Sequence, residues 1–414
     1  MSETRARRSR SGGGAARRAE RTAVSVETER YIERNIPLYE FLDEATLEII
    51  EYNAETVLEE IGVNFVDSPE ALERWRSVGA TIEGERVRIP RGLARELCKT
   101  APSKFVQHAR NPERNVEIGG KTLVTAPVYG PPFVRDRDGG RRYATLADFQ
   151  KFVKLGYMSK WLHHSGGTIC EPTDVPVNKR HLDMVYSHIR FSDRAFLGSI
   201  THPDRAADSI AMACMVFGAE FMEKNCVIMG NFNSTSPLVW DGITTQGITR
   251  YAEAGQGSIL LPFLLGGAVA PLIMAGQVAQ CVAESMVGVA LTQLVRPGAP
   301  ALLAGFLSSM SLRSGSPTFG TPEPALGSLV MGQIARRLNL PLRCAGNFST
   351  SKMPDAQAMT QSMMSVMSAV QGGANYILHC AGFLDGLLSM SYEKFVLDTD
   401  LCGQLHSYMR GLDF

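Results

Sequence analysis

A repeated rhythm of short apolar runs separated by amphipathic stretches constrains the fold of this chain more than any other feature. From residue 122 onward the apolar runs are TLVTAPVY, HHSGGTIC, RAFLGSI, CVIMGNFN, SILLPFLLG, PALLAGFL, PLRCAGNF and NYILHCAGF. They recur roughly every 30 to 42 residues, the length of a strand followed by a helix and a modest loop. Because the runs are continuous rather than alternating, they indicate parallel strands buried on both faces.

Eight strand–helix units favour a closed (β/α)8 barrel, the TIM-barrel architecture of the α/β class, with residues 392–410 as the eighth helix. An open, doubly wound sheet is the competing architecture, but the first unit, APVYGPPFV, has no glycine-rich phosphate loop. The next stretch, FVRDRDGGRRYAT, indicates a hairpin inserted into the first connection and turning at Asp138-Gly139. The sequence therefore predicts a barrel over residues 121–414.

The part of the chain before the barrel divides into two segments. Residues 27–120 predict an N-terminal helical and mixed extension, with its clearest helical periodicity in TLEIIEYNAETVLEEIGV. Residues 1–26 contain the basic, Gly-rich stretch RARRSRSGGGAARRAER, so we expect a disordered tail there. A targeting arm is the alternative, although the stretch lacks the apolar region of a secretory signal.

Composition narrows the class of protein. The chain has 42 Lys and Arg against 42 Asp and Glu, which argues against a general binder of nucleic acid or of membrane surfaces. Its eight cysteines form no C-x-x-C pair, so they indicate free thiols in a reducing, cytoplasmic setting. Pro262 and Pro271 interrupt the longest apolar stretch, so we expect no membrane-spanning helix.

In a barrel of this kind, functional residues lie at the carboxyl ends of the strands and in the loops that follow. Those positions hold, among others, Tyr129, Asn233, Trp240, Phe263, Phe306, Arg313, Asn347 and His379. The strand ends carry no carboxylate pair, no set of metal ligands and no lysine suited to a Schiff base. A neutral mouth rich in amides and aromatic rings favours a soft organic cation such as a quaternary ammonium. The alternative is that these aromatic residues are ordinary core.

His379 ends the last apolar run, at Tyr376–Leu378. It is either a structural residue with satisfied hydrogen bonds or a ligand-binding residue, and the sequence leaves both interpretations open. The pair His163-His164 begins the second run, at the end of the barrel opposite the expected site. We therefore expect those two histidines to be structural.

Four motifs closely resemble the trimethylamine methyltransferase family of corrinoid-dependent enzymes: SGSPTFGTPEPAL, ARRLNLPLRCAGNFSTSKMPDAQA, GANYILHCAGFLDGLLSMSYEKFVLD and APVYGPPFVRDRDGG. The resemblance covers the chain from about residue 30 to its end. It implies the same barrel fold and the transfer of a methyl group from a methylated amine to Co(I) of a corrinoid (cobalamin). A cognate corrinoid protein would carry that cofactor and dock over the barrel mouth.

The resemblance also implies a branch of the family. Its founding trimethylamine enzymes carry pyrrolysine, whereas this chain has only standard residues. It therefore resembles the branch without pyrrolysine, whose characterised members demethylate small quaternary amines such as glycine betaine, proline betaine or carnitine. Two alternatives stay open: methyl transfer to another acceptor such as tetrahydrofolate, and a barrel that binds methylated amines without turnover.

The resemblance and the strand-end positions together suggest roles for the candidate residues. Tyr129, Trp240, Phe263 and Phe306 are expected to cage the methyl groups, and His379, Asn233, Asn347 and Arg313 are expected to hold a substrate carboxylate. No residue is assigned as a general acid or base, because a quaternary ammonium departs as a neutral amine. We expect no tightly bound metal. The apolar helix at 275–295 suits either the barrel exterior or a contact between two copies of the chain.

Overall fold

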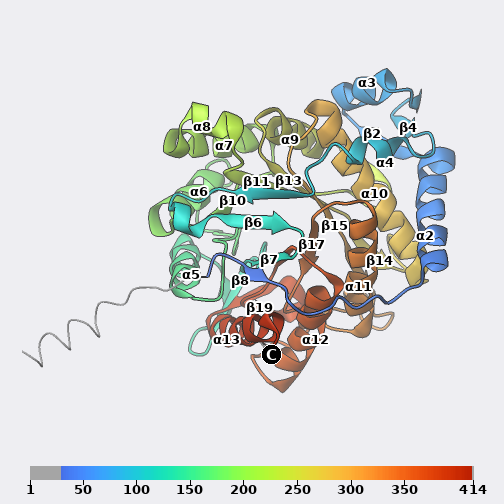
Figure 1. Cartoon of the computed structure of the whole chain (residues 1–414). Coiled ribbons are helices and arrows are strands. Elements are labelled where there is room, and N and C mark those ends of the chain that lie inside the picture. The colour runs from blue at the N-terminus through green and yellow to red at the C-terminus, as the bar shows by residue number, and fades with distance from the viewer. Residues whose placement is uncertain (1–28, 413–414) are drawn as a thin grey trace, which may run out of the picture.

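The computed structural model describes residues 29–412, so the predicted tail at 1–26 lies outside the described residues. Its central sheet runs in the order β10-β11-β13-β15-β17-β18-β7, with every neighbouring pair parallel (Figure 1). The strands are β7 (Thr122–Thr125), β10 (Phe196–Leu197), β11 (Ile228–Asn233), β13 (Gly257–Leu261), β15 (Ala301–Ala304), β17 (Leu342–Ala345) and β18 (Tyr376–Leu378). This sheet curls into the predicted (β/α)8 barrel.

Residues 163–167 fill the eighth position between β7 and β10. Hydrogen bonds run from the N–H groups of His163, Ser165 and Leu197 to the carbonyls of Thr125, Ala195 and Gly166, at 3.1, 2.9 and 2.8 Å. The segment is not a regular strand, so that part of the prediction is wrong. Gly166 adopts a φ of 85°, which breaks the extended backbone that a ladder requires.

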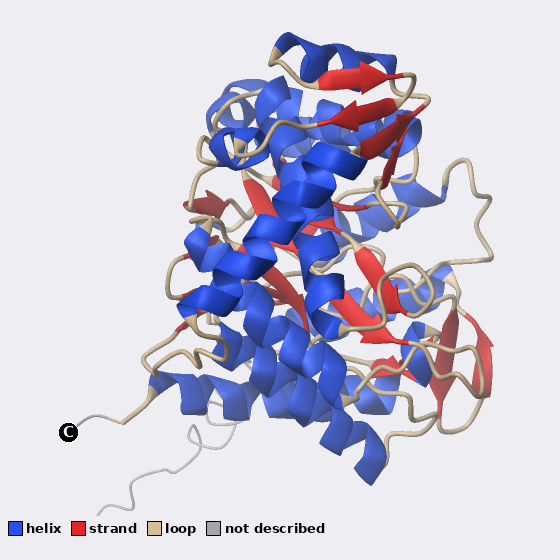
Figure 2. Cartoon of the chain, turned by 90° about the vertical axis from the view of Figure 1, so that its right-hand side faces the viewer, coloured by secondary structure: helices blue, strands red, loops and turns tan. Residues whose placement is uncertain are grey.

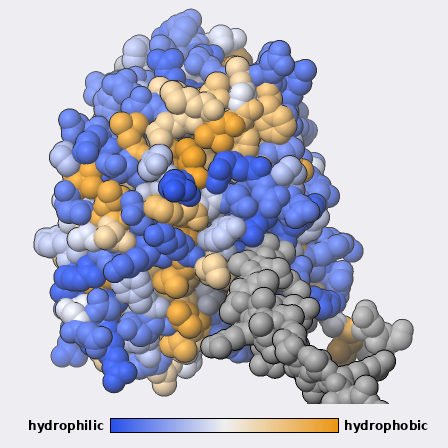
Figure 3. Space-filling model, turned by 90° about the vertical axis from the view of Figure 1, so that its left-hand side faces the viewer, coloured by the Kyte–Doolittle hydropathy of each residue, from blue (hydrophilic) through white to orange (hydrophobic). Residues whose placement is uncertain are grey.

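Helices surround the sheet in the order that alternating units require (Figure 1). They are α5 (Leu146–Met158), α6 (Arg180–Phe191), α7 (Pro203–Phe217) with the short α8 (Ala219–Lys224), α9 (Gly242–Glu253), α10 (Met274–Val295), α11 (Pro322–Arg337), α12 (Ala356–Gly372) and α13 (Tyr392–Arg410). Asp241, Asp355 and Ser391 cap α9, α12 and α13, since each side chain accepts a backbone N–H of the first turn. On the face shown in Figure 3, hydrophobic side chains form separate patches between hydrophilic ones.

Among the described helices, α10 alone is long and apolar enough to cross a membrane, and 89% of its most apolar stretch is buried inside the molecule. Its outer side is covered by α2 (Glu44–Thr56) and α4 (Leu93–Cys98) of the N-terminal segment. Figure 2 shows helices packed over this side of the molecule. The apolar face at 275–295 is therefore used within the chain and is not free to meet a second copy.

The N-terminal segment adds a small sheet and a hairpin to the barrel. The small sheet, ordered β12-β2-β4-β3, lies beside α3 (Pro69–Ser77) and contains β2 (Val63–Val66), β3 (Thr81–Glu83), β4 (Arg86–Arg88) and β12 (Val239–Asp241). The hairpin of β5 (Lys104–Gln107) and β6 (Val116–Gly119) continues the sheet at β7, and β1 (Ile32–Glu33) also pairs with β7. The boundary near residue 120 stays a prediction.

Short strands extend the barrel at the carboxyl ends of its strands. The pair β14 (Phe263–Gly266) and β16 (Phe306–Ser309) follows β13 and β15, and a sheet ordered β19-β20-β8-β9 lies nearby. Its members are β8 (Phe133–Asp136), β9 (Gly140–Tyr143), β19 (Phe383–Leu384) and β20 (Ser389–Ser391). The antiparallel pair β8–β9 confirms the hairpin predicted at Asp138-Gly139.

Candidate active site

A pocket of about 640 Å³ lies at the carboxyl ends of the barrel strands. Its lining includes Gly130, Arg141, Phe263, Phe319, Lys352 and Asp385, which lie in the connections between β7, β13, β15, β17 and β18 and the helices that follow them. Arg141 and Asp385 form an ion pair at 3.2 Å on the rim. Both the position and the size suit a site for a small molecule.

Five phenylalanines pack together beside this pocket, and we call them the aromatic cluster: Phe263, Phe306, Phe319, Phe348 and Phe383. Ring centroids are 4.6 Å apart for Phe263–Phe306, 4.8 Å for Phe306–Phe348, 5.4 Å for Phe319–Phe348 and 5.0 Å for Phe348–Phe383. The members come from four consecutive strand–helix units. The predicted set contained two of them, Phe263 and Phe306. The other three directly follow strand ends or occupy a long βα loop, which is the signal that points to them.

His379 lies between the aromatic cluster and the barrel interior. Its ring lies 5.7 Å from that of Phe348 and 5.8 Å from that of Phe383. Its Nδ1 lies 3.3 Å from the backbone N of Tyr129, and its Nε2 lies 3.2 Å from Nη2 of Arg343. Burial and, secondarily, the charge of Arg343 lower the pKa of His379 well below 6.5, so the imidazole is neutral.

Tyr129 is brought to the same place by the end of β7. Its ring packs on Gly167, where an added Cβ would approach the Tyr129 ring to 2.8 Å. Burial raises the pKa of its hydroxyl, which is hydrogen-bonded to Thr168. Tyr129 therefore presents a neutral ring next to His379, and Gly167 is required for the close approach.

Two asparagines at strand ends carry amide oxygens that lack partners among the described residues. Asn347 is fully buried, its Nδ2 donates to the carbonyl of Cys380, and its Oδ1 has no donor within the described part of the chain. Asn231, absent from the predicted set, is buried with a similarly unmatched Oδ1, and its Nδ2 is 3.5 Å from Oδ1 of Asn233. Asn233 itself is exposed at the end of β11.

Two of the predicted site residues lie elsewhere. Trp240 is fully buried in β12 of the small sheet, paired with Phe65, and its ring lies against Gly288 of α10. It packs outside the barrel wall, so its position does not allow the predicted role in a methyl cage. Arg313 is exposed on the loop between β16 and α11, and the described structure gives it no contact with His379.

Glu284 of α10 shapes the loop after β11. Its buried carboxylate accepts hydrogen bonds from the hydroxyls of Ser234 and Ser236 at 2.6 and 2.7 Å and from the backbone N–H of Leu238 at 2.9 Å. Gln280 donates a further bond at 2.8 Å. Because this carboxylate is fully engaged, we interpret it as structural support for the loop that follows Asn233.

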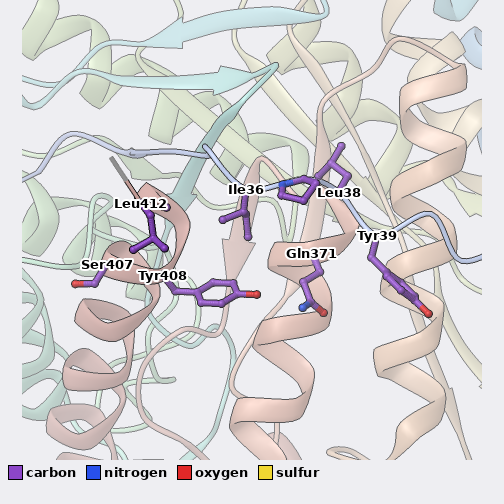
Figure 4. Close-up of a pocket in the computed structure, with 9 residues that line it drawn as sticks. Ile36, Leu38, Tyr39, Gln371, Ser407, Tyr408 and Leu412 are labelled. Carbon is purple, nitrogen blue, oxygen red and sulfur yellow. The ribbon is translucent and has the colours of Figure 1, made fainter. Parts of the chain in front are cut away.

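A second pocket, of about 530 Å³, lies near the carboxyl ends of α12 and α13 (Figure 4). Its lining includes Ile36, Leu38, Tyr39, Gln371 and Tyr408, and no charged side chain of the described structure lines it. In a barrel this end is opposite to the one that carries function. In residues 29–412 no group of three His, Cys, Asp or Glu side chains is placed to hold a metal ion.

Comparisons with known proteins identify the family. A sequence model of the trimethylamine methyltransferase family matches residues 10–414. The chain is 41% identical to the glycine betaine methyltransferase of Desulfitobacterium hafniense (strain Y51), over 92% of this chain and 79% of that protein. It is 29% identical to the proline betaine:corrinoid methyltransferase of Eubacterium limosum, over 86% of this chain and 75% of that protein.

A solved structure supports the fold alone. The crystal structure of the Methanosarcina barkeri monomethylamine methyltransferase superposes with a TM-score of 0.56 at 12% identity, covering 91% of this chain and 83% of that one. The resemblance seen in the four motifs is confirmed by the family match, and the chain belongs to the trimethylamine methyltransferase family, on the branch without pyrrolysine.

Proposed function

We propose that this chain removes a methyl group from a small, betaine-like quaternary amine and passes it to Co(I) of a corrinoid carried by a separate protein. The observation that carries the proposal is the aromatic cluster at the functional end of the barrel, next to the neutral His379. The two relatives named above, whose names specify glycine betaine and proline betaine, support the same class of substrate.

The geometry suits the chemistry of a quaternary ammonium. Such a cation is attracted to the faces of aromatic rings, and the cluster supplies five rings within a few ångströms of one another. When the C–N bond breaks, its electron pair stays on nitrogen and a neutral tertiary amine departs. No proton has to move, so a site without a general acid is sufficient. The residues bind the cation, exclude water and orient one methyl group toward the open mouth.

The corrinoid, once its carrier protein docks, supplies the nucleophilic Co(I). We propose that the carrier docks over the loops at the mouth. Leu272, Ile273, Leu312 and Met353 lie on the loops after β14, β16 and β17, and each is more than half exposed. Exposed apolar side chains grouped on one end of a molecule mark a surface for another protein.

We also propose a cytoplasmic location. All eight cysteines are free thiols, and seven of them are buried. Burial raises the pKa of several of these thiols, for example Cys98 and Cys344 to about 12, so they are unreactive core residues. Such a pattern is typical of a reducing compartment.

A methyl-transfer assay with chemically reduced cobalamin tests the proposal. Absorbance follows the methylation of the corrinoid in the presence of glycine betaine, proline betaine, carnitine, choline or trimethylamine. We expect transfer from a quaternary amine and none from trimethylamine. Turnover that needs tetrahydrofolate and no corrinoid would favour a different acceptor, and binding without any transfer would favour a binding protein.

A matched pair of variants links the activity to the cluster. Phe348→Ala removes the ring that contacts both Phe306 and His379 and should lower kcat/KM. Phe221→Ala removes a ring from α8, which lies in the outer layer of helices, and should leave kcat/KM unchanged. Equal effects of the two variants would separate the activity from the aromatic cluster.

A further inference from the structure

A third pocket, of about 390 Å³, lies at the amino ends of the barrel strands, opposite the mouth. Its lining includes Gly120, Leu342 and Asn375, which stand at or just before the starts of β7, β17 and β18. Three cationic residues also line it, Arg34, Lys104 and Arg336, and no acidic side chain of the described structure does. A cavity of this size accommodates a small molecule.

The guanidinium of Arg34 is buried in the wall of this pocket with few partners. Arg34 is 4% exposed, and its Nη2 donates to the carbonyl of Ala374 at 2.6 Å. Within residues 29–412 its Nε has no acceptor and no acid forms an ion pair with it. Burial and, secondarily, the charge of Arg336 lower the pKa of Arg34 to about 10, so the side chain stays charged at neutral pH. A buried cation without a counter-charge is strongly unfavourable.

The other two cations of the pocket already have acidic partners. Nη2 of Arg336 lies 2.9 Å from both carboxylate oxygens of Glu40. Nζ of Lys104 lies 2.7 Å from the carboxylate of Glu117. The uncompensated positive charge of the pocket therefore belongs to Arg34.

A second buried arginine shows how this fold treats a structural one. Arg194 is 2% exposed, and its guanidinium donates to the backbone carbonyls of Gly156, Tyr157, Ser159 and Leu162. Its charge is therefore shared among several backbone dipoles. Arg34 has one such carbonyl within the described residues and lines an open cavity instead. The difference indicates that a ligand completes the partners of Arg34.

We propose that this pocket binds a small organic oxyanion, a carboxylate or a phosphate ester, through Arg34. A guanidinium donates several hydrogen bonds in one plane, which matches the oxygens of either group. Leu38, Leu340 and Leu342 line the same pocket and offer apolar contact to a short hydrocarbon body. The pocket lies at the end of the barrel away from the mouth, so the inference does not depend on the proposed function.

Calorimetric titration tests the pocket with sodium phosphate, sodium acetate and sodium benzoate as probes, which separate a phosphate site from a carboxylate site. Benzoate should bind more tightly than acetate because its ring contacts the apolar wall. Arg34→Met should weaken the anions that bind by about 30-fold or more, and Arg34→Lys, which keeps the charge without the planar guanidinium, should fall between. Arg88→Met removes an exposed arginine of the small sheet, paired with Glu83 at 3.4 Å, and should bind as the wild type does.

Two results of this titration would overturn the proposal. One is the absence of binding of all three probes to the wild type. The other is wild-type affinity in folded Arg34→Met.

Thermal melts separate lost binding from lost stability. A ligand that binds only the folded chain raises its melting temperature, so benzoate should raise that of the wild type in proportion to its occupancy. Arg194→Met leaves four carbonyls without donors and should melt lower, yet it should keep the rise with benzoate. Arg34→Met should lose the rise, whatever its own melting temperature. An equal rise in Arg34→Met and the wild type would contradict the role of Arg34.

Competition with glycine betaine distinguishes the pocket from the candidate active site. Because the two sites lie at opposite ends of the barrel, saturating glycine betaine should leave the affinity for benzoate unchanged. Displacement of benzoate by glycine betaine would place the anion at the mouth and overturn the proposal. A chain that binds benzoate through Arg34 but transfers no methyl group would retain this site and lose the proposed function.

Discussion

Two buried polar regions of the barrel differ in how fully their hydrogen bonds are satisfied: a group of four histidines, and His379 with its neighbours. The first, which we call the histidine network, consists of His163 and His164 of the irregular segment at 163–167 together with His188 and His406. In it, His163 accepts from the N–H of Thr125 at 2.9 Å and meets His406 at 2.9 Å. His164 accepts from the N–H of Gly166 at 2.9 Å and donates to Gln107 at 3.1 Å.

His188 completes the pattern, since it accepts from the hydroxyl of Ser165 at 2.7 Å and donates to the carbonyl of Gly167 at 2.8 Å. Every ring of the histidine network can therefore adopt one neutral tautomer that satisfies its neighbours. His379 has no such tautomer, because both of its ring nitrogens face donors. Satisfied polar groups of this kind specify the fold, and an unsatisfied group marks a place where a ligand completes the structure.

We expect acid to have the largest effect on stability, mainly because it protonates the histidines of the histidine network in the unfolded chain. Burial lowers the pKa of His188 and His406 to about 4 and that of His163 and His164 well below 6.5. Well above pH 6.5 these residues are neutral in both the folded and the unfolded chain. As the pH falls from 6.5 toward 4, the unfolded chain binds protons that the folded chain does not. The free energy of unfolding should fall by about 1.4 kcal/mol per pH unit for each such histidine.

Urea unfolding at pH 7, 6 and 5 measures this slope. His188→Gln keeps polar atoms at the same place without a titrating group, so its slope should be smaller by one proton. A free energy of unfolding that stays constant between pH 7 and pH 5 would show that these histidines are not held neutral in the folded state.

Replacing one member of the histidine network should have the next largest effect. His164→Leu leaves the N–H of Gly166, the hydroxyl of Tyr376 and the side chain of Gln107 without their partner. We expect a loss of about 3 kcal/mol or more in the free energy of unfolding, because each buried group keeps its desolvation penalty. His379→Leu is the matched variant and should cost less than about 1 kcal/mol, since it removes a mismatch. Equal losses in urea unfolding would contradict the comparison.

The sequence predicted the barrel because its signal is spread over eight units. The pattern of continuous apolar runs at regular spacing remains recognisable even when one of the eight strands is irregular. The irregular segment at 163–167 was the exception, because its two glycines and the bonds of His163 and His164 replace a ladder. Periodicity does not distinguish an extended strand from a segment held by side chains and glycine geometry.

The site was less predictable, for physical reasons that differ from residue to residue. Strand-end position pointed to Tyr129, Phe306 and His379, which lie near the aromatic cluster, and their roles stay predictions. It failed for Trp240, because the loop after β11 turns back to pair with β2, a long-range contact with no local signal. Arg343 lies one residue inside an apolar strand, in PLRCAGNF. A charged residue between buried apolar neighbours was the available signal, and its meaning depends on partners that only the fold reveals.

His379→Ala tests the role of the mismatched histidine in binding. We expect kcat/KM for glycine betaine to fall by about 30-fold, equivalent to about 2 kcal/mol, mainly through KM because the residue orients the substrate and transfers no proton. Thermal melting should stay cooperative. His163→Ala is a comparison from the histidine network and should lose stability instead. Loss of the cooperative melt in His379→Ala would return His379 to a structural role.

Arg141→Gln should have the smallest effect on KM and on stability. It tests a charged residue near the site that already has partners. Arg141 lies on the rim of the mouth pocket, pairs with Asp385 at 3.2 Å and has its guanidinium 3.9 Å from the centre of the Phe133 ring. Because it is exposed and already has partners, removing its charge should change KM by less than about threefold and stability by less than about 1 kcal/mol. His379→Ala, tested in parallel, should change KM far more. A side chain on the rim that already has partners should matter less than the buried His379, and a large KM effect in Arg141→Gln would move substrate recognition from the strand ends to the rim.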